Sequence, residues 1–399
     1  MSVNNDWWPG FSDSEYEDRY RNVRAAMEQR GLDALLVYGS SIYFGTDPGA
    51  PNLVYLAGYA PGLHGYVVLP REGHPTLLVY VPNHRANAQL ISVIDDVRAG
   101  NDLAGLAVQR LGELNYELGA VGIVGNFDWS GVSIPVEHYQ AFTEALPGAK
   151  LEVVTRWYED LRLVKSAEEL ALLQAGAVLT DRAHEALRTS VRPGVTDMAL
   201  HNEVLRGVQD AGGKIPFGHV GSTPMRQPAM RYPNFYPVNR VIQPGDVVLT
   251  EIAAGYGTYF GKIFGTLFVG PPTAQYRQMF EVAAEIYDAI YAALTPGMQA
   301  GDVESVLDGR ASETGYRSLS YISGWSTYNT PPAHSRPSGA DADMELRTGQ
   351  CLAVVSYVVN PDNEHMGIWL GDTAVVSDTG LRSLHTYRLT DIDYVTVWS

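Results

Sequence analysis

The sequence predicts a protein of the α/β (α+β) class with two domains, for three reasons. Short apolar runs typical of buried strands alternate with helical patterns over the first ~160 residues. The pattern changes between residues 155 and 165, where a long helix begins. Beyond that point, parts of the chain resemble each other at a constant offset. We therefore expect domains at residues 1–160 and 161–399, the second built by duplication.

The first domain is predicted from strands that alternate with helices. Helices are indicated where apolar residues recur every three to four positions, and strands where short apolar runs stand between turn residues. This alternation is typical of an α/β domain whose sheet is at least partly parallel. The predicted strands cover residues 34–38, 65–69, 76–81 and 121–124, and the predicted helices cover residues 14–30, 103–114 and 136–145.

The second domain opens with a helix-start signal and contains an internal repeat. Ser166 and Glu169 form the Ser-x-x-Glu pattern of a capping box, which predicts a helix that reaches Ser190. Two pairs of segments match, namely residues 186–195 with 289–298 and residues 244–249 with 348–353. The offsets are 289 − 186 = 103 and 348 − 244 = 104 residues. They predict two related halves, each of two helices followed by antiparallel-type strands, and a ligand site where the halves meet.

Composition argues against several classes of protein. Lys and Arg number 28 and Asp and Glu number 45, so the net charge is −17, which argues against binding to nucleic acid or to an anionic membrane surface. The N-terminus lacks the pattern of a signal peptide, and no apolar run approaches the ~18 residues of a membrane span. The single cysteine, Cys351, lies in an apolar run and cannot form an intrachain disulfide. We expect a cytoplasmic protein that acts on a small molecule.

Several segments together resemble the superfamily of creatinase, aminopeptidase P and prolidase. Residues 162–169 are similar to the R-x-x-K-S-x-x-E start of its M24-type catalytic domain, and residues 52–59 to the N-x-x-Y-L-[ST]-G-[FY] motif of its N-terminal domain. Residues 193–194, 237–247 and 371–376 resemble further signatures. The resemblance implies a creatinase-like N-terminal α/β domain, a C-terminal pita-bread domain with a pseudo-twofold duplication, and a homodimer.

The peptidases of this family hold two divalent metal ions with Asp, Asp, His, Glu and Glu, and the ions activate a bridging water. Carried over one at a time, these ligand positions fall on Glu251, Lys262, Ser323, Val355 and Gly371. Glu251 alone keeps a carboxylate, so the resemblance implies a divergent member that lacks the dinuclear metal ligands. We expect no metal and no other cofactor.

Four residues are candidates for chemistry in such a pocket: His219, Glu251, Lys262 and His334. Lys262 beside Glu251 would place an ammonium where the family has metal charge. The pair either fills the site structurally or leaves the ammonium to bind a substrate carboxylate or polarise a carbonyl. His219 is an acid/base candidate because histidine titrates near neutral pH, and a structural role is the alternative. His334 resembles the family's second His motif and either reaches the site or lies in a surface loop.

Polar and aromatic residues nearby are candidates for binding the substrate. Arginine suits a carboxylate or phosphate, and tyrosine suits a flat or cationic ligand, with a solvated loop or core packing as the alternatives. The family's substrate-facing His is replaced by Asn234. By resemblance, His64 contacts the partner subunit's site, and a surface turn is the alternative. The candidates are Arg226, Arg231, Tyr232, Asn234, Tyr236, Tyr259, Trp325, Tyr328, Tyr357 and His64.

The leading hypothesis is a metal-independent, creatinase-like enzyme that acts on a small polar metabolite carrying a carboxylate. It would hydrolyse a C–N bond by acid/base catalysis or perform a related lyase or rearrangement step. The first alternative is a non-catalytic binding protein on the scaffold of an inactive peptidase. The second is a metal-dependent Xaa-Pro peptidase-like hydrolase or lyase with relocated ligands. Its ligands would come from His219, His334, His365 or Glu364, together with Glu251 and Asp372.

Overall fold

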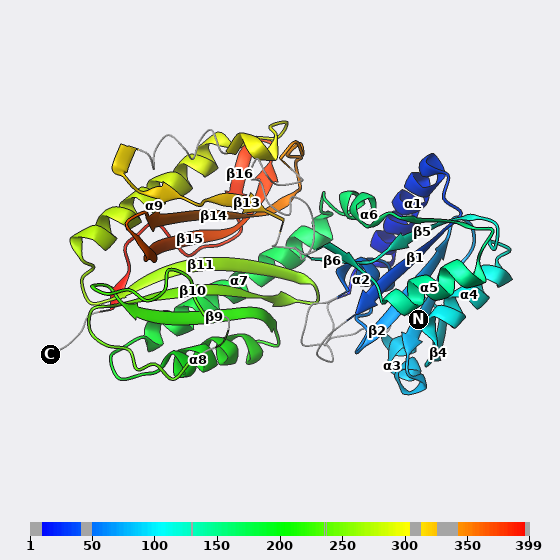
Figure 1. Cartoon of the computed structure of the whole chain (residues 1–399), viewed down its shortest axis with the longest axis horizontal. Coiled ribbons are helices and arrows are strands. Elements are labelled where there is room, and N and C mark those ends of the chain that lie inside the picture. The colour runs from blue at the N-terminus through cyan, green and yellow to red at the C-terminus, as the bar shows by residue number, and fades with distance from the viewer. Residues whose placement is uncertain are drawn as a thin grey trace. The chain divides into compact units, whose positions relative to one another are not determined.

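The protein folds as two compact units, residues 1–163 and 164–399, each with its own core (Figure 1). The computed structural model describes residues 10–40, 50–128, 131–234, 236, 238–303, 313–324 and 342–395. Three predicted site residues, Trp325, Tyr328 and His334, lie outside these ranges. None of the helices in the described ranges is both long and apolar enough to cross a membrane.

The first unit is a mixed sheet with helices on both faces. The strand order is β4-β3-β2-β1-β5-β8, and β1 runs parallel to β5 but antiparallel to β2, so the predicted partly parallel sheet is confirmed. The strands are β1 (Ala34–Ser40), β2 (His64–Pro70), β3 (Thr76–Tyr80), β4 (Asp96–Gly100), β5 (Ala120–Val124) and β8 (Lys150–Val153), with a separate hairpin of β6 (Asn126–Asp128) and β7 (Gly131–Ser133). The helices are α1 (Asp13–Arg30), α2 (Pro51–Ala57), α3 (Arg85–Ile91), α4 (Leu103–Glu113), α5 (Val136–Ala145) and α6 (Thr155–Leu161), with a short 3-10 turn η1 (Pro82–His84).

The two faces of this sheet bury separate clusters because side chains alternate along a strand. On β1, Leu35 and Val37 belong to a cluster with residues of α1, α2 and α6. Leu36 and Tyr38 belong to another, with residues of α4 and α5. Burial on both faces explains why the strands read as continuous apolar runs in the sequence.

The second unit is one long sheet of order β12-β14-β15-β11-β10-β9, to which β13, β16 and β17 add at β14, β15 and β11. Its first helix begins at the predicted capping box of Ser166 and Glu169. The helices are α7 (Ala167–Ser190), α8 (Asp197–Gln209) and α9 (Ala274–Ala293), with a 3-10 turn η2 (Ala300–Asp302). The strands are β9 (Lys214–Pro224), β10 (Asp246–Tyr256), β11 (Tyr259–Val269), β12 (Arg317–Ser318), β13 (Tyr321–Ser323), β14 (Cys351–Asn360), β15 (Asn363–Ser377), β16 (Gly380–Ser383) and β17 (Tyr394–Val395).

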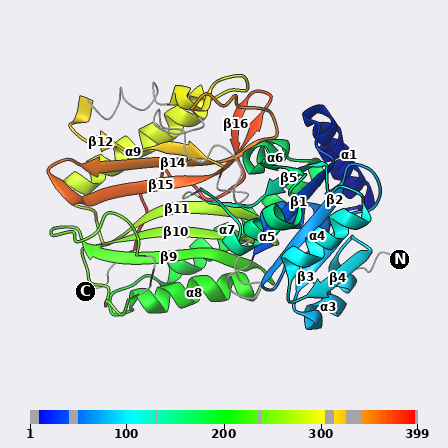
Figure 2. The ribbon, with the colours of Figure 1, turned by 45° about the vertical axis from the view of Figure 1, so that its right-hand side comes forward.

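The predicted duplication is confirmed by matching elements and backbone angles in the two halves. α7 packs on the β10–β11 hairpin and α9 packs on the β14–β15 hairpin (Figures 1 and 2). The glycines of the matched Pro-Gly turns, Gly194 and Gly297, have φ of +91° and +90°. These left-handed angles favour glycine, so both halves conserve the same turn geometry within one chain.

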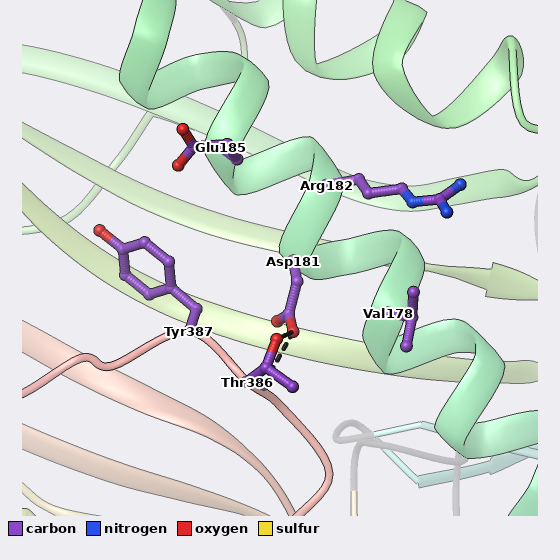
Figure 3. A pocket seen from close by; sticks show the side chains of 6 residues that line it. All are labelled: Val178, Asp181, Arg182, Glu185, Thr386 and Tyr387. Carbon is purple, nitrogen blue, oxygen red and sulfur yellow. Dashed lines mark hydrogen bonds between the residues drawn. The ribbon is translucent and has the colours of Figure 1, made fainter.

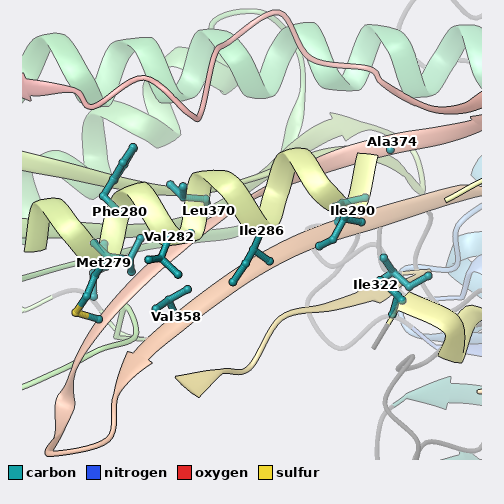
Figure 4. Close-up of a cluster of buried hydrophobic side chains, with 14 of the residues drawn as sticks. Met279, Phe280, Val282, Ile286, Ile290, Ile322, Val358, Leu370 and Ala374 are labelled. Carbon is teal, nitrogen blue, oxygen red and sulfur yellow. The ribbon is translucent and has the colours of Figure 1, made fainter. Parts of the chain in front are cut away.

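The α9 side of the sheet is a packed apolar core. Met279, Ile286 and Ile290 recur at helical spacing on α9 and meet Val358 and Leu370 of β14 and β15 (Figure 4). Alternation along these strands turns their other residues to the opposite side of the sheet. We call that side the inner face, defined by Glu251 on β10, Lys262 on β11, Tyr357 on β14 and Trp369 on β15.

Candidate functional site

Glu251 and Lys262 form a buried ion pair on the inner face. Glu251 lies opposite Phe264 in the β10–β11 register, and Lys262 is two residues from Phe264, so both side chains share one face. Lys262 Nζ lies 2.5 Å from Glu251 Oε1, and the two side chains are 6% and 7% exposed. Burial alone would raise the pKa of Glu251, but the Lys262 ammonium brings this pKa below its ordinary value. Glu251 is therefore an ionised carboxylate with a fixed counterion.

Tyr232 and His219 complete the polar part of this cluster. The Tyr232 hydroxyl donates a hydrogen bond of 2.7 Å to Glu251 Oε2. Burial, and then the Glu251 charge, raise the pKa of Tyr232, so it remains a proton donor. His219 on β9 lies directly opposite Glu251 and shares its face. The site thus combines a carboxylate, an ammonium, a phenol and an imidazole.

Trp369 joins these polar groups to an aromatic wall, and sequence reasoning missed it. Its ring centroid lies 4.9 Å from that of Tyr232, 4.7 Å from that of Tyr357 and 4.9 Å from that of Phe264. Trp369 Nε1 is buried and has no hydrogen-bond partner within the described ranges. The available signal was its position two residues before Gly371, which places both on the inner face.

The positions predicted for metal ligands do come together, but Glu251 is the one carboxylate among them and none of them carries an imidazole. Val355 lies opposite Gly371 in the β14–β15 register, and Gly371 lies opposite Phe264 of β11. Ser323 of β13 lies opposite Ala353 of β14. Valine and glycine carry no donor atom, so the carboxylate of Glu251 stands beside an ammonium rather than beside further carboxylates.

The described residues therefore do not fit a pair of divalent metal ions. No group of three or more His, Cys, Asp and Glu side chains among them could hold a metal ion. A Cβ at Gly371 would lie 2.4 Å from the backbone oxygen of Val354, so this backbone has no room for a ligating side chain there. We derive no catalytic step through a metal.

The residues named for a relocated metal site do not converge on Glu251. Glu364 and His365 are 81% and 55% exposed and lie 3.8 Å from each other. Asp372 follows Gly371 on β15 and so faces the other side of the sheet, where the hydroxyls of Tyr287 and Tyr291 donate to it. His334 is outside the described residues, and of the described members of this set His219 is the one that lies directly opposite Glu251.

The remaining predicted binding residues divide between the site and other places. Tyr357 belongs to the aromatic wall, and its hydroxyl donates to the backbone oxygen of Arg231 at 3.3 Å. The backbone of Asn234 lies close to Gly221 of β9. His64 lies in the first unit, where its ring stacks on His138 with centroids 5.6 Å apart. Its contact with a partner subunit stays a prediction.

Three predicted binding residues are not among the inner-face contacts described above. Arg226 is exposed in the turn after β9. Tyr236 is 83% exposed and takes no part in a buried pocket. Tyr259 is three residues before Lys262 on β11 and therefore points to the opposite face, where its hydroxyl donates to Glu169 of α7 at 2.7 Å.

A separate hollow lies between α7 and the segment that follows β16 (Figure 3). It has a volume of about 460 Å³ and is lined by Val178, Asp181, Arg182, Glu185, Thr386 and Tyr387. Both oxygens of Asp181 already accept hydrogen bonds, one from Thr386 and one from the ring of His385. These contacts attach the C-terminal segment to α7, and the hollow is not part of the inner face.

Comparison with known proteins identifies the class of protein that this fold represents. Residues 171–378, more than half of the chain, match the metallopeptidase family M24. Residues 19–164 match the creatinase/prolidase N-terminal domain. The chain therefore belongs to the M24 metallopeptidase family, and the predicted superfamily and fold are confirmed.

Its named relatives are hydrolytic enzymes. The chain is 24% identical over 372 residues to the uncharacterized peptidase YqhT of Bacillus subtilis, with 92% of this chain and 97% of that protein covered. It is 26% identical to the Xaa-Pro dipeptidase of Lactobacillus helveticus, with 65% and 69% covered. It is 22% identical to the ectoine hydrolase of Halomonas elongata, with 77% and 78% covered.

A solved structure shows the same fold over nearly the whole chain. The prolidase of Pyrococcus horikoshii superposes with a TM-score of 0.77 at 20% identity, covering 93% of this chain and 99% of that one.

The named relatives contradict the leading hypothesis of a metal-independent, creatinase-like enzyme, which is wrong. Their names point to the second alternative, a peptidase-like hydrolase.

Proposed function

We propose that this chain is a peptidase-like hydrolase that cleaves an amide bond in a small substrate of the Xaa-Pro dipeptide type. The supporting observation is similarity along both domains to proteins named as peptidases and dipeptidases, with 97% of YqhT covered. The inner face supplies suitable chemistry, because an ionised carboxylate and a protonated phenol lie within 2.7 Å of each other there.

In this proposal the inner-face residues bind the substrate and transfer protons to and from it. The Lys262 ammonium offers hydrogen bonds to a carboxylate or carbonyl of the substrate, while the Tyr232 hydroxyl donates to Glu251. The rings of Tyr357 and Trp369 form an apolar wall against which a proline ring would pack. Glu251 orients both donors through its two oxygens. A small-molecule substrate, a homodimer and a cytoplasmic location stay predictions of the sequence.

The test is release of free proline from a panel of Xaa-Pro dipeptides by the purified chain. Each reaction is run after chelation and again with added Mn²⁺, Co²⁺ or Zn²⁺, and ectoine is included as a separate amide-type probe. We expect turnover, and a loss of kcat/KM of about 100-fold or more in Glu251→Gln. Glu203→Gln, on the exposed side of α8, is the matched control and should keep full activity. Absence of turnover under every metal condition would overturn the proposal.

The Lys262–Glu251 ion pair favours a second candidate, a non-catalytic binding protein. A carboxylate already neutralised by an ammonium at 2.5 Å has lost the negative charge that attracts a metal ion. This candidate predicts that calorimetry detects dipeptide binding that Trp369→Ala weakens, while no product forms. The two candidates therefore differ in turnover and share the binding surface.

A further inference from the structure

We infer that Lys262 excludes a divalent metal ion from the position between β10 and β11, so that any metal used by this chain is held by other residues. The inference rests on the charges and donor atoms of the inner face. It does not depend on the proposed hydrolysis, because it concerns which cation accompanies Glu251.

The first argument is charge. Lys262 Nζ and Glu251 Oε1 are 2.5 Å apart, and the oxygen-to-metal distance for such an ion is about 2.0–2.6 Å. A metal ion bound to Glu251 would therefore occupy the volume of the ammonium or press against it. Like charges this close repel strongly in a partly desolvated site, so the ammonium and the metal ion compete for one carboxylate.

The second argument is the scarcity of donors around Glu251. Divalent ions in proteins take at least three or four ligands from carboxylates, imidazoles, carbonyls or thiolates. Val355 and Gly371, at neighbouring positions on the inner face, offer no side-chain donor. The Tyr232 hydroxyl is committed as a donor to the second oxygen of Glu251. Among the described residues, His219 is the remaining metal-binding side chain opposite Glu251, so these residues do not supply a ligand set at this position.

The third argument is that moving the Lys262 side chain out of this position costs free energy. Its side chain is 6% exposed, and its ammonium also lies 4.8 Å from the centre of the Phe264 ring. Moving it away would leave a buried carboxylate without its counterion, which is strongly unfavourable. The chain therefore carries its own cation at this place in the sheet.

The test is metal binding, measured by calorimetry and by the visible absorption of Co²⁺, on the wild type, Glu251→Gln, Lys262→Asp and Lys262→Met. We expect Glu251→Gln to leave the wild-type affinity for Co²⁺ and Mn²⁺ unchanged. Lys262→Asp creates a second carboxylate beside Glu251 and His219 and should bind one more Co²⁺ per chain than the wild type. Adding Glu251→Gln to Lys262→Asp should weaken that new site by about tenfold or more. Lys262→Met, which removes the ammonium without adding a ligand, is the matched control and should gain no such ion.

Two results would overturn the inference. One is a loss of about tenfold or more in wild-type metal affinity in Glu251→Gln, which would place a metal ion on Glu251 beside Lys262. The other is a folded Lys262→Asp that binds no additional ion, which would show that the ammonium is not what excludes the metal. Circular dichroism establishes folding, and if Lys262→Asp does not fold, the comparison of wild type with Glu251→Gln decides. Because the readout is ion binding, failure here leaves the dipeptidase assay unaffected.

Discussion

Two carboxylates are buried on opposite faces of the same sheet, and they are neutralised in different ways. Glu251 on the inner face has an ammonium at 2.5 Å and a phenol at 2.7 Å. Asp372 faces α9 and accepts hydrogen bonds from Tyr287, Tyr291 and Ser383, at 2.9, 2.5 and 2.5 Å. Burial raises the pKa of Asp372 above its ordinary value, whereas the pKa of Glu251 is lowered.

The difference shows what a counterion does that hydroxyl groups do not. His385 nearby and three hydroxyl donors lower the pKa of Asp372, but together they do not fully offset the loss of hydration around its charge. The ammonium of Lys262 does offset that loss for Glu251. The counterion thus keeps Glu251 charged on the inner face, whereas Asp372 is held by local hydrogen bonds within the otherwise apolar α9 side.

The largest expected effect comes from removing the counterion. Lys262→Met leaves Glu251 buried without its ammonium and should lower the free energy of unfolding by about 3–5 kcal/mol. The matched control is Arg206→Met, because the Arg206–Glu203 pair has a similar distance of 2.7 Å but is solvent exposed, and its loss should be within about 1 kcal/mol. Urea denaturation measures both, and equal losses would contradict the importance given to burial.

A smaller effect is expected from removing one hydroxyl donor at each carboxylate. Tyr232→Phe takes a hydrogen bond from an ionised group and should cost about 1.5–3 kcal/mol. Tyr287→Phe removes one of three donors to a carboxyl that ionises less readily, and should cost about 0.5–1.5 kcal/mol. Chemical denaturation at neutral pH compares the two variants. A larger loss in Tyr287→Phe would reverse the comparison between the faces.

The smallest effect is a difference in the pH dependence of stability, at most about 1.4 kcal/mol for each pH unit. The stabilisation from Glu251 is present above its unfolded-state pKa and is lost as the pH falls through its lower folded-state pKa. Asp372 has the opposite sign, because the folded state keeps its proton to higher pH and stability falls as the pH rises through that pKa.

Glu251→Gln and Asp372→Asn isolate these two contributions. The stability of the wild type minus that of the variant should rise with pH for Glu251→Gln and fall with pH for Asp372→Asn. Urea denaturation across the acidic range, starting where the wild type is still folded, provides the measurement. Slopes of the same sign would show that the two carboxylates share one environment.

Local signals in the sequence predicted most elements of the fold. The capping box at Ser166 located the start of α7, and the matched turns at Gly194 and Gly297 revealed the duplication. Such features depend on residues a few positions apart, or on a repeat that is visible along the chain. The resemblance then supplied the five positions that the strand registers bring together.

The contacts of the site were harder to predict from the sequence because they join residues that are far apart in the chain. The bond from Tyr232 to Glu251 depends on how the loop before β10 folds over the sheet. The sequence alone did not distinguish Tyr259 from the other aromatic candidates. Side chains alternate along β11, and the side chain of Tyr259 points toward α7. Asp372 was named for a relocated metal site, whereas hydroxyl groups of α9 and β16 donate hydrogen bonds to it. The leading hypothesis treated the missing ligands as decisive for function, and the named relatives contradict it.

Gly371 has a consequence for the engineering of this site. A Cβ at this position would meet the backbone oxygen of Val354 at 2.4 Å and the ring of Phe264 at 2.9 Å. A carboxylate therefore cannot be introduced here by one substitution, because the strand spacing and Phe264 would have to change first. A variant with a side chain at position 371 and the present neighbours would be strained. Adding a metal-ligating side chain at position 371 therefore takes at least two coordinated changes, one at the glycine and one at Phe264 or the strand spacing.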